Sequence, residues 1–160
     1  MEASEESKEK VMLQELTWRP RLEESATIPE AFLDLFQGKH IPHFTTLLAD
    51  GSPRCSLVWC DFDGMYLRFS VTTKHITGLT VANDPRVVCM VADPAVLDRY
   101  IEVRGVIEKI VPDPEADHVY RLASLRGVVQ PVPYPGASDR VILYMKPTVV
   151  FSFPGYHHHY

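Results

Sequence analysis

The stretch Leu47–Thr73, LLADGSPRCSLVWCDFDGMYLRFSVTT, decides the fold. Two turn signals divide it into apolar runs: Asp50-Gly51-Ser52-Pro53 and Asp63-Gly64. An Asp-Gly pair between two strand-like runs is a strong signal for a tight hairpin. We therefore expect strands at 40–49, 54–61 and 66–71. Strands that are joined by such short turns run antiparallel.

The sequence on both sides continues this pattern of short apolar runs. Further strands are expected at 86–92, 99–111, 140–146 and 148–153, the last two separated by Pro147. Short helices are expected after a capping-box pattern at 27–30, from Thr72 or Thr73 to about Asn83, and from Asp113 to about Arg126. Six or seven mostly antiparallel strands with short helices make a mainly β, α+β fold. Its hairpin-rich order favours a barrel over a doubly wound parallel sheet.

Length and composition limit the classes of function. A chain of 160 residues suits one domain, expected at 27–153, with an N-terminal extension at 1–26 and a C-terminal tail at 154–160. The net charge of -5 and the scattered Lys and Arg argue against nucleic-acid binding. The charged N-terminus and the lack of long apolar runs predict neither a secretory signal nor a membrane helix.

The cysteines and the C-terminal histidines do not indicate a metal site. Three cysteines lie within apolar runs without CxxC spacing, as expected of buried residues in a cytoplasmic protein. The adjacent His157, His158 and His159 cannot all face one ion on a regular backbone, and we interpret them as a tail. We therefore expect no bound metal.

An ordered set of short segments gives the sequence a family resemblance. The segments are Leu47–Pro53, Ser56–Trp59, Leu67–Thr73, Asn83–Val87, Asp93-Pro94 and Tyr100–Gly105. Over residues 28–152 the chain resembles the pyridoxamine-phosphate-oxidase-like split barrels, and within them the small deazaflavin (coenzyme F420)-dependent oxidoreductases. The resemblance implies a split β-barrel similar to the FMN-binding barrels. It also implies a homodimer with a site for F420 or FMN at each interface.

The resemblance also assigns the site residues. It implies that the strand Ser56, Leu57, Val58, Trp59 lines the cofactor ring and that Ser70, Thr72 and Thr73 hold phosphate through their hydroxyls. After the third strand the family usually carries a Gly followed by several Arg and Lys, but this chain has Lys74-His75-Ile76-Thr77-Gly78-Leu79. Lys74 is therefore the expected phosphate contact, with His75 and Thr77 beside it. Arg54, Tyr134 and Tyr156 are candidates for substrate contacts.

Three functions remain open at the level of sequence. The first is an F420-dependent reductase that delivers hydride to an enone in a planar substrate, as in polyketide antibiotic biosynthesis. The second is an FMN-dependent oxidase or reductase on the same fold. The third is a non-catalytic barrel that binds a cofactor or another planar ligand. The residues themselves do not select a proton donor, so no catalytic residue is assigned.

Overall fold

One seven-stranded antiparallel sheet dominates the computed structural model, which describes residues 26–96 and 98–155. The strand order is β2-β1-β5-β6-β7-β4-β3, so β2 and β3 form the two edges. The strands are β1 (His43–Leu47), β2 (Pro53–Leu57), β3 (Cys60–Phe62), β4 (Leu67–Thr72), β5 (Arg86–Ala92), β6 (Arg99–Pro112) and β7 (Arg140–Pro154). The mainly β fold with short helices is confirmed, and its two free edges make the barrel a split one.

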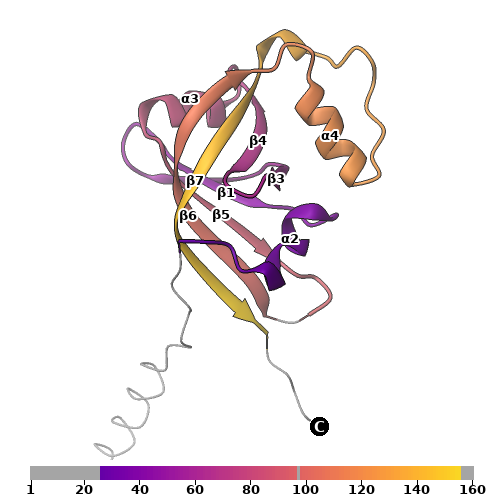
Figure 1. Ribbon diagram of the computed structural model, residues 1–160. Helices are drawn as coiled ribbons and strands as arrows, with labels where there is room; N and C mark the ends of the chain where they lie inside the picture. Colours follow the sequence, from indigo (N-terminus) through magenta and orange to yellow (C-terminus); the bar gives the residue numbers. More distant parts are fainter. Residues whose placement is uncertain (1–25, 97, 156–160) are drawn as a thin grey trace, which may run out of the picture.

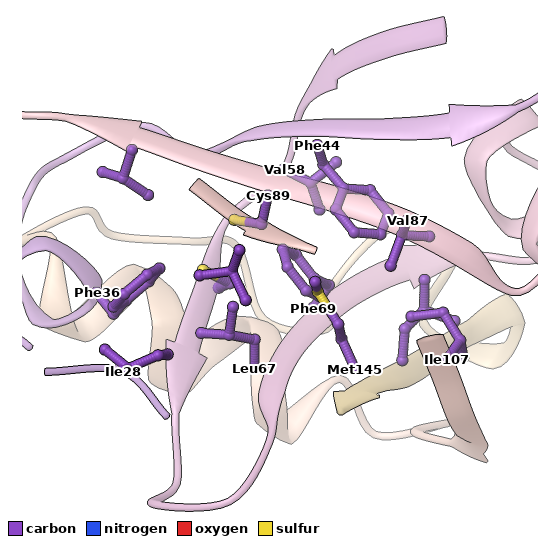
Figure 2. Close-up of a cluster of buried hydrophobic side chains, with 14 of the residues drawn as sticks. Ile28, Phe36, Phe44, Val58, Leu67, Phe69, Val87, Cys89, Ile107 and Met145 are labelled. Carbon is purple, nitrogen blue, oxygen red and sulfur yellow. The ribbon is translucent and has the colours of Figure 1, made fainter. Parts of the chain in front are cut away.

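The long strands β6 and β7 pair along almost their whole length and form the spine of the sheet (Figure 1). Alternate residues of the strands point into one apolar core, to which β4 contributes Leu67, Phe69 and Val71. Figure 2 shows the rings of Phe44 and Phe69 in this core, with Cys89 and Met145 nearby; the ring centroids lie 4.2 Å apart. Cys60 and Cys89 are therefore core residues, as the sequence predicts, but the same prediction is wrong for Cys55, which is exposed on the edge strand β2.

The run at 54–61 is two strands, where the sequence predicted one. β2 ends at Leu57 and β3 begins at Cys60, and these strands lie at opposite edges of the sheet. Val58 and Trp59 make the crossing; the Val58 N–H donates to the Pro42 carbonyl. The sequence does not reveal this change, because the apolar run at 57–60 continues across the crossing without a turn residue.

The last two predicted strands are one strand, β7, and Pro147 does not divide it. Pro147 lies opposite Gly105, where the pairing of β6 and β7 shifts register. A bulge accommodates a residue that has no N–H to donate. The backbones come so close here that a Cβ on Gly105 would lie 2.2 Å from the Lys146 carbonyl oxygen.

The helices are shorter than the sequence predicted. The helix expected at 30–37 is a 3-10 turn, η1 (Glu30–Phe32), followed by the single turn α2 (Asp34–Gln37), and no side chain caps η1. α3 (Ile76–Asn83) is capped by His75 and not by Thr72 or Thr73. α4 (Asp117–Leu125) begins after Asp113, whose carboxylate accepts the N–H groups of residues 117 and 118. The loop at 128–137 leads to η2 (Ala137–Asp139) and then to β7.

Candidate functional site

A cavity of about 310 Å³ lies where α4 and its following loop meet the β4–β7 pair. Figure 1 shows α4 and α3 in the same half of the molecule, on either side of β4. The lining residues come from the crossing between β2 and β3, from β4, from α4 and from the loop before β7: Leu57, Val58, Trp59, Ser70, Val71, Thr72, His75, Val119, Leu122, Gln130, Tyr134 and Arg140. This volume is at the small end of the range for ligand pockets.

The apolar part of the cavity has two walls. The crossing residues Leu57, Val58 and Trp59 form one, and Val119 and Leu122 on α4 form the other. The sequence proposed the residues of the first wall as cofactor contacts, and they line this cavity, but it gave no indication of the second wall. The hydrophobic face of α4 was visible as a helical pattern, but the surface that it covers depends on the sheet topology.

Polar contacts with β3, buried at Arg126 and partly exposed at Arg121, hold α4 in place. Arg126, just after the helix, donates to the Cys60 carbonyl at 3.0 Å, and its guanidinium lies 5.4 Å from the centre of the Trp59 ring. Arg121 donates to the buried Asp61 carboxylate at 3.0 Å, and Asp61 also receives two hydrogen bonds from Arg68. These contacts fix α4 against the sheet and so define the width of the cavity.

A hydrogen-bonded chain connects β2 with the start of α3. The Ser56 and Thr77 hydroxyls lie 3.3 Å apart, and Thr77 Oγ1 lies 3.2 Å from His75 Nδ1. His75 Nδ1 also accepts the Thr77 N–H, so Nδ1 is unprotonated and a neutral ring carries its proton on Nε2. His75 lines the cavity, whereas Ser56 and Thr77, which the sequence also proposed as cofactor contacts, do not line it and reach it only through His75.

Several predicted contacts lie elsewhere. Lys74 forms an ion pair with Asp139 at 2.7 Å, its side chain is 77% exposed, and it does not line the cavity. Thr73 is exposed and donates to the Asp139 carbonyl at 3.4 Å. Arg54 is exposed on the edge strand β2 and does not line the cavity either. The expected cofactor roles of Lys74 and Thr73 and the substrate role of Arg54 thus lack support from this cavity.

Three of the residues predicted as ligand contacts, Ser70, Thr72 and Tyr134, line the cavity, and so does Arg140, which the sequence did not reveal. Arg140 Nη2 donates to the Ser70 hydroxyl at 2.9 Å and to its carbonyl at 3.2 Å. The guanidinium lies 5.1 Å from the centre of the Tyr134 ring. Antiparallel pairing places Arg140 opposite Thr72. Tyr156, the N-terminal extension 1–25 and the C-terminal histidines fall outside the described residues.

The cavity suits a flat ligand with a negative charge. Its walls are apolar and aromatic on two sides, its hydroxyls and Arg140 can hold an anion, and none of the described lining residues is acidic. Arg140 Nε is buried without a hydrogen-bond partner in the described part of the chain. Such an unsatisfied group favours an additional acceptor. The residues present therefore fit a flavin-type cofactor with a phosphate.

Comparisons with known proteins identify the family of this chain. The family model "Pyridoxamine 5'-phosphate oxidase" matches residues 28–153. An F420 reductase of known structure is 34% identical, with a TM-score of 0.73, over 77% of this chain and 98% of that chain. The General Stress Protein 26 from Bacillus anthracis is 18% identical with a TM-score of 0.60, over 78% of this chain and 92% of that chain.

More distant matches share the fold of this chain but are too dissimilar in sequence to indicate its function. A heme binding protein from Mycobacterium smegmatis is 21% identical with a TM-score of 0.55, over 82% of this chain and 57% of that chain. No curated protein matches the chain. No helix in the described residues is long and apolar enough to cross a membrane. The chain therefore belongs to the pyridoxamine 5'-phosphate oxidase family of split barrels, on the branch of the F420-dependent oxidoreductases.

Proposed function

We propose that this protein is an F420-dependent reductase, active as a homodimer, that transfers hydride to the electron-poor C=C bond of an enone in a planar substrate. The observation that carries the proposal is the cavity itself. It combines an apolar wall at the crossing between two strands with an unpaired cation, and no acidic residue lines it within the described chain. The 34% identity to an F420 reductase supports deazaflavin as the cofactor.

The chain's own residues bind and orient the ligands in this proposal. Val58 and Trp59 hold the ring system from the β2–β3 crossing, and Val119 and Leu122 exclude water from its other side. Ser70, Thr72 and His75 bind the polar tail. When bound, the reduced deazaflavin supplies the hydride, which is cofactor chemistry that the protein only has to position. In the proposed reaction the β-carbon of the enone would accept that hydride, and a proton from water or an acid would complete the reduction at the neighbouring carbon.

A second copy of the chain completes the site. The outer face of β5, β6 and β7 is not covered by any described helix, and it carries half-buried apolar side chains, among them Met90, Tyr100, Phe151 and Phe153. This face continues through β1 to Leu57 on β2, which lines the cavity and is nevertheless 62% exposed. Contiguous exposed apolar surface of this kind marks an association site. The partner subunit would cover Leu57 and close the open side of the cavity.

The aromatic loop that borders the cavity supports a planar substrate. Tyr134 contributes its ring to the lining and packs edge-on against Tyr120, with centroids 6.0 Å apart. The Tyr120 hydroxyl donates to the Pro131 carbonyl at 2.9 Å, which ties the loop to α4. A planar, polyketide-like enone suits this aromatic border, because stacked aromatic surfaces favour flat ligands.

The decisive experiment is a pair of fluorescence titrations, one with F420 and one with FMN, followed by turnover of reduced F420 with a panel of planar enones. We expect tighter binding of F420 and oxidation of reduced F420 in the presence of at least one enone. Tighter binding of FMN would favour the flavin-dependent alternative. Binding without oxidation across the whole panel would favour a non-catalytic barrel and contradict the reductase assignment.

A further inference from the structure

The cationic residue of the cavity is not the one that the family pattern indicates. Lys74 follows the third strand of the hairpin series, where the family carries its basic residues, but its ammonium group pairs with Asp139 in solvent. Breaking this exposed ion pair would cost little free energy. The Lys74 side chain would, however, also have to turn towards the cavity, which it does not line. The structure therefore gives the phosphate no cation from this segment as it stands.

Arg140 meets the requirements that Lys74 does not. It is the first residue of β7, pairs with Thr72 across the sheet, and lines the cavity. Its Nη2 uses the Ser70 oxygens as acceptors, which fixes the guanidinium at this end of the cavity. Because the contact is to a hydroxyl and a carbonyl, it holds the guanidinium without neutralising it.

The charge of Arg140 has no counterpart in the described structure. No carboxylate lies within 4.0 Å of its guanidinium among residues 26–96 and 98–155, whereas Arg68, Arg86, Arg99, Arg104 and Arg121 each have one. Asp139, the neighbour of Arg140 in sequence, is occupied by Lys74. Arg126 also has an unpartnered Nε, but it does not line the cavity. A partly buried, uncompensated guanidinium in a cavity attracts an anion.

We propose that Arg140, and not Lys74, binds the anionic group of the ligand in this cavity, and that this group is the phosphate in the tail of the cofactor. The inference rests on the proposed function for the identity of the ligand. The planar guanidinium offers paired N–H donors to phosphate oxygens, and the Thr72 hydroxyl and His75 lie in the same cavity as further donors. Lys74 contributes indirectly, because it occupies Asp139 and so leaves Arg140 free for the ligand.

The test compares binding of F420 with binding of the same deazaflavin ring without its phosphate-bearing tail. We expect Arg140→Gln to weaken F420 binding about 30-fold, as loss of a charge-assisted hydrogen bond does, and to change binding of the tail-free ring by less than about 3-fold. Arg140→Lys should recover part of the affinity, because it restores the charge but not the paired donors. Lys74→Gln should weaken F420 binding less than Arg140→Gln.

The matched control is Arg86→Gln, which removes the same charge from an exposed residue outside the cavity and should leave F420 affinity unchanged. Circular dichroism and the melting temperature show whether each variant is folded. Two results would overturn the inference even if the wild type binds F420. One is that Arg140→Gln weakens binding of F420 and of the tail-free ring equally. The other is that Lys74→Gln weakens F420 binding more than Arg140→Gln does.

A different outcome separates the inference from the proposed function. If the wild-type protein binds neither F420 nor FMN, the proposed function fails, and inorganic phosphate becomes the probe. Stabilisation of the wild type against heating by phosphate, lost in Arg140→Gln and kept in Arg86→Gln, would support the anion site by itself. No stabilisation of the wild type by phosphate would then overturn the role of Arg140 as well.

Discussion

Asp61 is a buried carboxylate on β3 that faces basic side chains from β4 and α4. Burial opposes its ionisation, but hydrogen bonds from Arg68 and Arg121 outweigh this cost and hold the pKa of Asp61 below its ordinary value. Its pKa is thus lower in the folded than in the unfolded protein. The stabilisation is therefore present above pH ~4, near the unfolded pKa, and is lost as the pH falls through the folded pKa.

Asp61→Asn should lower the free energy of unfolding at neutral pH by about 3 kcal/mol, because it leaves two arginines without their buried carboxylate. Urea denaturation at pH 7 measures this loss. Asp84→Asn is the matched control, since Asp84 pairs with Arg86 at the surface and should cost much less. Equal losses in the two variants would contradict the assigned role of Asp61.

His118 also makes stability fall with falling pH, but over a higher pH range than Asp61 does. Burial lowers the pKa of His118 below its ordinary value, and this effect outweighs the attraction of Asp61, 3.7 Å away. The unfolded chain therefore binds a proton at a higher pH than the folded protein does, and stability falls as the pH drops below about 6.5. Between pH 7 and pH ~5 the free energy of unfolding should fall less in the His118→Gln variant than in the wild type. The difference between the two falls should be about 1 kcal/mol. Parallel pH profiles of stability would refute this.

At the scale of elements, α3 can approach β4 closely because position 78 is a glycine. A Cβ there would lie 2.4 Å from the Thr72 carbonyl oxygen, closer than any real Cβ contact. The contact holds the start of α3, and with it His75, beside the cavity residue Thr72. Helix position and ligand binding are thus coupled through one backbone contact.

Gly78→Ala should force α3 away from β4 and cost about 2 kcal/mol of stability, the usual range for overpacking. Because the shift moves His75 relative to Thr72, we also expect weaker F420 binding in the fluorescence titration. Ala82→Gly is the control on the same helix: Ala82 is exposed, so the change lowers helix propensity without a clash. Wild-type affinity in a destabilised Gly78→Ala variant would show that α3 does not position the site.

Local sequence patterns predicted most individual strands and turns well, but they did not predict which distant segments pair in the sheet. The Asp63-Gly64 hairpin between β3 and β4 is as expected, with Gly64 at φ +100°, and β5 has the predicted bounds. The β2–β3 crossing at Val58 was missed, since an apolar run does not reveal that its two halves pair with different strands. Arg140 was missed for a related reason: it meets Ser70 only through the pairing of β4 with β7, seventy positions along the chain.

At the scale of the whole molecule, the sheet buries one face and leaves much of the other uncovered. The inward face of β5 and β6 carries Cys89, Ile101 and Val103, all fully buried. Of the outward residues, Arg104 covers the Phe151 ring at 4.9 Å and pairs with Glu102 at 2.7 Å. These polar contacts cover the apolar surface only in part. In the proposed homodimer this face, which is continuous with Leu57 at the cavity, would form the contact between the two copies.

Met90 and Phe151 lie near the centre of this face, on β5 and β7, and both are half-buried in the single chain. Met90→Asp combined with Phe151→Glu should convert the proposed dimer to a monomer, because a symmetric interface would bury two new carboxylates per subunit, and the nearby Arg104 is already paired with Glu102. Light scattering after size-exclusion chromatography measures the mass. The monomer should also bind F420 at least 10-fold more weakly, as expected if the partner subunit closes the cavity at Leu57.

Ile110→Asp is the control: it places a charge on an exposed residue of β6 beyond this face and should leave the dimer intact. A wild-type protein that is monomeric at all concentrations, or a monomeric variant with undiminished F420 affinity, would show that each chain forms its site alone.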